Sequence, residues 1–108
     1  MTDQEKITHL ASLLGWTRNF AFQCWRYANG ELAAFSTWNP LTSLADCEPL
    51  MDFVEAKNLR WEIYPTDSGH WCYITGDEKP YLSAGYAPTR AAAFCEAVLD
   101  AFPMKEGE

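Results

Sequence analysis

The chain has few of the residues on which most enzymes and metal sites depend. Its 108 residues include only two histidines, and its six glycines are isolated, so no glycine-rich phosphate-binding loop is present. The four cysteines are far apart and form no Cys-x-x-Cys pair, which excludes the common zinc motifs. We therefore expect no catalytic residue, no bound metal, no cofactor and no enzyme activity.

Long apolar runs are also missing. The richest stretch, residues 91–102, is interrupted by Glu96 and Asp100 and is far shorter than the roughly 18 residues that a membrane span needs. The first residues lack the basic and apolar regions of a signal peptide. These absences predict a cytoplasmic protein that does not bind membranes, in which the cysteines stay reduced and mostly fill the core.

Basic residues are scarce. The chain has eight Lys and Arg and 15 Asp and Glu, which gives a net charge of -7. The excess of acidic residues is located after residue 40. A negative surface repels phosphate backbones, so we expect no direct binding to nucleic acid and favour a protein partner with a basic surface. The plainer interpretation is the ordinary acidic surface of a soluble domain.

Apolar periodicity and turn residues divide the chain into three helices and five strands. Thr2 and Glu5 form a capping box before the first helix, and Asn29-Gly30 is typical of a tight hairpin turn. Pro49 is tolerated only in the first turn of a helix, so we place the cap of the second helix near Asp46. The predicted helices cover residues 3–14, 46–58 and 89–102, and the predicted strands cover residues 20–24, 31–36, 59–65, 69–75 and 80–86.

This order, α-β-β-α-β-β-β-α, predicts the α+β class with an antiparallel sheet. In the last three strands, alternation places aromatic residues on both faces, for example Trp61 on one and Tyr64 on the other. We therefore expect helices on both faces, as in an α-β-α sandwich. Residues 1–108 are expected to form a single domain, and residues 103–108 an acidic, frayed tail.

Several short motifs are similar to those of the phage ABA sandwich domain family, small bacteriophage and prophage proteins of mostly unknown function. The resemblance covers about Leu10 to Phe102. It implies an α-β-α layering and a phage or prophage origin, and it carries over no catalytic residue. The motifs are Leu14-Gly15-Trp16, Trp38-Asn39-Pro40-Leu41-Thr42 with Ala45-Asp46, Trp61-Glu62-Ile63, Ala87-Pro88-Thr89, and Ala92, Cys95, Ala97 and Leu99 of the last helix.

Surface residues are then the candidates for function. In our interpretation, the acidic residues of the second helix face a basic partner. A small core cannot bury every aromatic side chain, and exposed aromatic side chains are typical anchors of protein interfaces. The Asp67-Ser68-Gly69-His70 run holds the residue types of a catalytic triad, but its spacing indicates a turn. The predicted protein-binding residues are Asp46, Glu48, Asp52, Glu55, Trp38, Trp71 and Tyr73, and the wider set of candidate surface aromatics adds Trp16, Trp25, Tyr64 and Tyr81.

The leading hypothesis is a non-enzymatic phage accessory protein that binds a host or phage protein. Its sharp form is an inhibitor of a bacterial defence complex, such as an anti-CRISPR protein, that presents carboxylates where phosphates would lie. The alternative is a self-associating structural phage protein, in which an aromatic patch or sheet edge pairs two copies as a homodimer. An enzyme would need a pocket with a perturbed carboxylate or thiolate.

Overall fold

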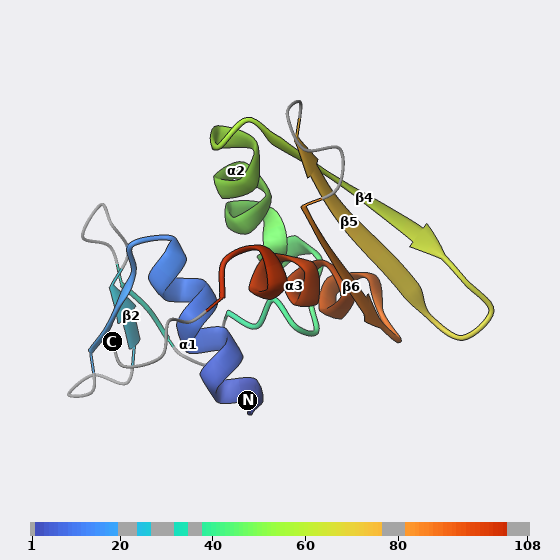
Figure 1. The fold of residues 1–108 in the computed structure, drawn as a ribbon. Helices are drawn as coiled ribbons and strands as arrows, with labels where there is room; N and C mark the ends of the chain where they lie inside the picture. The colour runs from blue at the N-terminus through green and yellow to red at the C-terminus, as the bar shows by residue number, and fades with distance from the viewer. Residues whose placement is uncertain (1, 20–23, 27–31, 35–37, 77–81, 104–108) are drawn as a thin grey trace.

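The computed structural model describes residues 2–19, 24–26, 32–34, 38–76 and 82–103 of the chain (Figure 1). The α+β class is as predicted, with every strand pair antiparallel. Only Pro103 of the predicted frayed tail lies within the described residues. In chain order the elements are α1 (Asp3–Leu13), β1 (Thr17–Asn19), β2 (Cys24–Arg26), β3 (Leu32–Ala34), the 3-10 turn η2 (Ala45–Cys47), α2 (Glu48–Ala56), β4 (Leu59–Pro65), β5 (His70–Gly76), β6 (Ser83–Ala87) and α3 (Arg90–Ala101).

The helix α1 begins and ends close to its predicted limits. The hydroxyl of Thr2 accepts the backbone N–H of Glu5 at 3.2 Å, which satisfies one of the free amides of the first turn. After Leu13 the chain turns at Gly15, whose φ of 78° lies in the left-handed region that glycine adopts without strain. The helix buries Ile7 and Leu10 on one face, so the apolar stripe seen in the sequence is its core side.

A small sheet follows α1 and has the strand order β1-β2-β3. The antiparallel pairing of β2 with β3 agrees with the predicted hairpin, but β2 begins at Cys24, where the predicted strand 20–24 ends. Residues 20–23 and the expected Asn29-Gly30 turn lie outside the described residues. The first strand, β1, was not predicted, and it makes the observed order α-β-β-β-α-β-β-β-α. Figure 1 shows this sheet at the opposite end of the molecule from the second one.

A compact turn leads from the first half of the chain into α2. The side chain of Asn39 accepts the N–H of Leu41 at 3.1 Å, and its carbonyl accepts the N–H groups of Thr42 and Ser43. Pro49 lies in the first turn of α2, as expected, and the cap is Cys47, one residue after the predicted one. A left-handed Asn58, with a φ of 60°, then directs the chain into β4.

The second sheet is the predicted meander, with the strand order β4-β5-β6. Its first strand has the predicted limits, its second begins one residue later than predicted, and residues 77–81 before the third are not described. Alternate residues of β5 and β6 face α3 and are buried, among them Cys72, Ile74 and Ser83.

The helix α3 lies directly on the strand β6. A Cβ atom added at Gly85 would lie 2.3 Å from the backbone nitrogen of Ala97 and 2.6 Å from the carbonyl oxygen of Ala93. The hydroxyl of Ser83 donates to the carbonyl of Ala97 at 2.8 Å, and so satisfies a buried polar group. Small residues on both elements therefore allow the helix backbone and the strand backbone to touch.

The helices predicted for both faces of β4–β6 are confirmed on one face only, because among the described residues aromatic side chains on the opposite face are exposed. In the described part of the chain, Tyr64, Trp71 and Tyr86 on that face are 48%, 39% and 40% exposed. Aromatic residues do occur on both faces of the meander, as the alternation indicated. On the open face, however, they pack against one another across the strands instead of under a helix.

Candidate protein-binding surfaces

Four rings form a cluster on the open side of the second sheet, which we call the aromatic face: Tyr64 of β4, Trp71 and Tyr73 of β5, and Tyr86 of β6. Trp71 is central, because it lies directly opposite Tyr64 on one neighbouring strand and Tyr86 on the other. Its ring centroid is 5.1 Å from that of Tyr86 and 6.0 Å from that of Tyr73, which in turn lies 5.8 Å from Tyr64. Aromatic rings in contact on a solvent-facing sheet are typical anchors of protein interfaces.

Hydrogen bonds hold the outer rings of the aromatic face in place. The Tyr64 hydroxyl donates to the carboxylate of Glu62, and this bond raises the pKa of Tyr64 above its usual value. On the other side, the hydroxyls of Tyr86 and Ser68 share a hydrogen bond. Both outer tyrosines thus keep a fixed polar end and present an apolar ring surface.

The run that contains Asp67, Ser68 and His70 is a turn, as its spacing indicated. The N–H of Thr66 donates to the Gly69 carbonyl at 2.8 Å, and the N–H of Gly69 donates to the Thr66 hydroxyl at 3.0 Å. No hydrogen bond joins Ser68 to His70, both of which the structure describes; Ser68 instead bonds to Tyr86. Ser68 of this run therefore supports the aromatic face through Tyr86.

Three carboxylates form a second surface, the acidic stripe: Glu48, Asp52 and Glu55 of α2. They are spaced by four and three residues, which places them on one helix face, and all three are exposed. The basic residue at the end of this helix, Lys57, extends over the ring of Phe53 at 5.0 Å. Within the described ranges the only salt bridge joins Lys6 to Glu96, so no described basic group neutralises the stripe.

Asp46 and Trp38, two further predicted binding residues, have mainly internal partners. The Asp46 carboxylate accepts the N–H of Asn39, and its carbonyl accepts the indole N–H of Trp38, both at 2.9 Å. Trp38 is only 5% exposed and belongs to the core. The structure thus brings Glu48, Asp52 and Glu55 together on α2 and places Trp71 and Tyr73 on the second sheet. Asp46 and Trp38 instead hold the turn before α2 through their hydrogen bonds.

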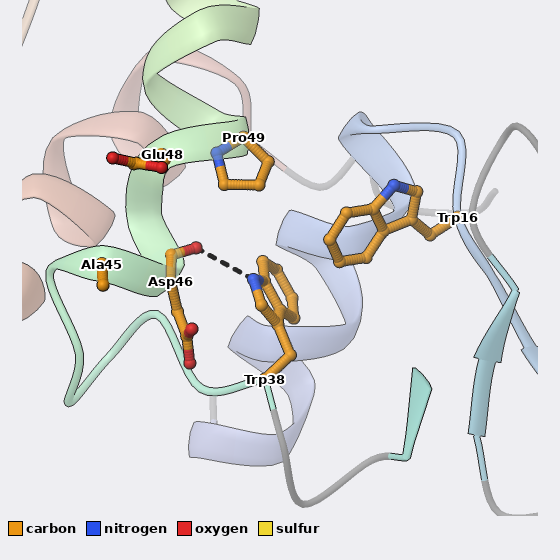
Figure 2. Close-up of a pocket in the computed structure, with 6 residues that line it drawn as sticks. All are labelled: Trp16, Trp38, Ala45, Asp46, Glu48 and Pro49. Carbon is orange, nitrogen blue, oxygen red and sulfur yellow. Dashed lines mark hydrogen bonds between the residues drawn. The ribbon is translucent and has the colours of Figure 1, made fainter. Parts of the chain in front are cut away.

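A hollow of about 280 Å³ lies beside Trp38, and we call it the indole hollow (Figure 2). The Trp16 and Trp38 rings meet edge to face with their centroids 4.6 Å apart. Figure 2 shows Trp16 on one side of the Trp38 ring and the two acids on the other. The lining residues are Trp16, Trp38, Ala45, Asp46, Glu48 and Pro49.

Three cysteines are buried in the core: Cys47 of η2, Cys72 of β5 and Cys95 of α3. The thiols of Cys47 and Cys95 both donate to the carbonyl of Pro40, at 3.2 and 3.3 Å. Burial raises the pKa of Cys72 to about 12. The pKa of Cys95 is also raised, first by its hydrogen bond with Cys47 and then by burial. Since the thiolate is the reactive form, Cys72 and Cys95 are poor nucleophiles, and burial shields the Cys47 thiol from reagents.

Alkylation tests this description of the thiols. In a Cys24→Ala variant, we expect iodoacetamide to modify Cys47, Cys72 and Cys95 at least about 10³-fold more slowly in the native state than in urea, because reaction requires an opening of the core. Mass spectrometry of the alkylated peptides measures each site. Rapid native modification of any one of them would reveal a reactive thiol and reopen the question of covalent catalysis.

Known proteins add no functional information. The chain matches no protein-family model, and neither a curated protein nor a solved structure is significantly similar to it. Within the described residues, no group of three or more His, Cys, Asp or Glu side chains could hold a metal ion. None of the described helices is both long and apolar enough to cross a bilayer. The aromatic face, the acidic stripe and the indole hollow are thus the surfaces from which a function can be argued.

Proposed function

We propose that this chain is a non-enzymatic protein that acts by binding another protein, with the aromatic face as the main contact. The observation that supports this most directly is the exposure of Tyr64, Trp71 and Tyr86 on a sheet whose other side is covered by α3. Covering apolar surface contributes about 25 cal/mol per Å², so a partner that buries these rings gains binding free energy. Hydroxyls at the outer rings supply hydrogen-bonding groups at the rim.

The charge of the chain favours a partner with a basic surface. The acidic stripe adds three carboxylates along α2, and this helix packs against β4, the edge strand that carries Tyr64. The net charge of -7 would steer a basic protein toward the chain and repel nucleic acid. Electrostatic steering raises association rates, whereas buried aromatic anchors supply most of the affinity.

The sharp form of this proposal is a phage inhibitor of a bacterial defence complex. Two features support it: the resemblance to phage proteins and the row of exposed carboxylates on α2. Successive acids of the stripe lie about one helical turn apart, roughly 5 Å along the axis. In an anti-CRISPR-like role, this row would occupy a basic channel that otherwise holds nucleic acid.

Affinity capture from a bacterial host lysate tests the proposal with one variant for each surface. We expect Trp71→Ala to lower the binding of the captured protein by about 30-fold, the effect of losing a central hot-spot residue. The double reversal Glu48→Lys with Asp52→Lys should slow association and weaken capture most at low ionic strength, because the steering charge changes sign. Binding kinetics on the purified pair measure both effects.

Gln4→Ala, an exposed change on α1, is the matched control and should bind like the parent chain. Light scattering of the same variants identifies the occupant of the aromatic face. If the parent chain is a dimer that Trp71→Ala dissociates, a second copy occupies the face, and the self-associating structural protein replaces our proposal. Capture that is unchanged by both the ring deletion and the charge reversal would refute partner binding through these surfaces.

A further inference from the structure

The indole hollow has a lining that fits a cationic side chain. The described residues that line it are two tryptophans, a proline, an alanine and two acids, and the charged ones among them are Asp46 and Glu48. A volume of about 280 Å³ is below the range of about 300–1,000 Å³ that is common for pockets binding drug-sized ligands. The space therefore suits one side chain of a protein partner better than a nucleotide or a coenzyme.

The two acids and the Trp16 ring lie on different sides of the hollow. In Figure 2, Asp46 and Glu48 lie on the α2 side of the Trp38 ring, whereas Trp16 lies on the other side. A guest that satisfies both sides has an apolar stem to pack on the rings and a positive head to reach the acids. Lysine and arginine have this shape, but only arginine has a planar head that stacks on an indole and forks onto a carboxylate.

The hollow is built before any guest arrives. The indole N–H of Trp38 is fixed by the Asp46 carbonyl, and the Asp46 carboxylate is fixed by the N–H of Asn39, both at 2.9 Å. Trp38, 5% exposed, forms the floor, and half-buried Trp16 forms a wall in edge contact with it. A carboxylate has about four acceptor positions, so Asp46 can bind a guanidinium while it keeps its bond to Asn39.

We infer that the indole hollow receives an arginine side chain of the partner. This inference rests on the proposed function, because it names the residue type through which a basic partner is recognised. Glu48 belongs to both the hollow and the acidic stripe, so the two surfaces are continuous. One arginine fills the hollow while its basic neighbours lie along α2.

Nα-acetyl-arginine methylamide is the probe, and the indole N–H signals of Trp16 and Trp38 in a nitrogen-15 spectrum are the readout. We expect saturable shifts of these two signals with a dissociation constant on the order of 1–10 mM, as suits a ligand of so few atoms. Glu48→Gln should raise the dissociation constant of the probe by about 2–5-fold, since a partly exposed ion pair is lost. Asp52→Asn removes the same charge from the same helix outside the hollow and should leave the dissociation constant unchanged.

The neutral citrulline analogue and the lysine analogue complete the experiment. We expect citrulline to bind at least about 5-fold more weakly than arginine, because it cannot form the charge-assisted bonds, and lysine to bind more weakly because it cannot stack. Equal binding of citrulline, tighter binding of lysine, or no saturable shift of either indole signal would overturn the inference. An equal effect of Asp52→Asn and Glu48→Gln would also overturn it, since the charge and not the hollow would then be recognised.

The two proposals fail separately. If the probe does not bind but partner capture still depends on Trp71, the arginine site is refuted and the protein-binding function stands. If the probe binds in the hollow but no captured protein depends on the aromatic face or the acidic stripe, the proposed function is refuted and the arginine site stands.

Discussion

Replacing Gly85 with alanine should destabilise the chain by about 3 kcal/mol, at the upper end of what overpacking in a core costs. The added Cβ would lie 2.3 Å from the backbone nitrogen of Ala97 and 2.6 Å from the Ala93 carbonyl. Both atoms belong to the backbone of α3, so no side chain can rotate away and the whole helix must shift. Urea unfolding followed by tryptophan fluorescence measures the loss, and we expect the midpoint to fall by about 2 M.

Ala84→Ser is the control for this substitution. Ala84 is the neighbouring residue on the opposite, open face of β6, and it is half-buried. A change of one small side chain there should alter stability by less than about 0.5 kcal/mol. If Gly85→Ala were as stable as Ala84→Ser, α3 could not rest directly on the backbone of β6.

Truncation of Phe94 to alanine should destabilise the chain by about 3–5 kcal/mol, the usual result for a fully buried phenylalanine. Its side chain is fully buried, and its ring meets the Trp61 ring edge to face at 5.5 Å. The loss combines the cavity left between α3 and the sheet with the loss of this ring contact. Because small domains are stable by only about 5–15 kcal/mol, the variant should unfold well below the melting temperature of the parent chain.

Phe94→Leu separates volume from aromatic contact. It keeps most of the apolar volume and should cost no more than about 1.5 kcal/mol. Thermal unfolding monitored by circular dichroism measures both variants. A small loss in the alanine variant would contradict the placement of this ring at the centre of the core.

The elements that the sequence predicted well are those whose signals are local. Thr89 caps α3 through the N–H of Ala92, and the apolar spacing that follows marks the buried face of that helix. The strand β1 was missed because Thr17-Arg18-Asn19 has no apolar alternation, and only its pairing with β2 makes it a strand. Local patterns could not supply that long-range partner.

For the candidate surfaces as well, local patterns could be predicted and long-range contacts could not. The acidic stripe could be predicted, because residues spaced by four and three on one helix share a face. Tyr86 was not selected, because its contact with Trp71 depends on the β5–β6 register. The internal role of Asp46 and the burial of Trp38 depend on a turn that folds back onto α1 and α2, and the hollow draws its residues from segments more than twenty positions apart. Aromatic residues on both strand faces suggested two helical layers, but rings on the open face pack on one another instead.

The carbonyl of Pro40 accepts the thiols of both Cys47 and Cys95, and it lies two residues beyond the floor of the hollow. Trp38 is therefore connected through a short segment to the N-cap of α2 and to the middle of α3. Any reshaping of that floor would have to disturb contacts at the centre of the molecule. We therefore expect the hollow to be rigid and to select side chains by shape, so that it does not close around a side chain that fits poorly.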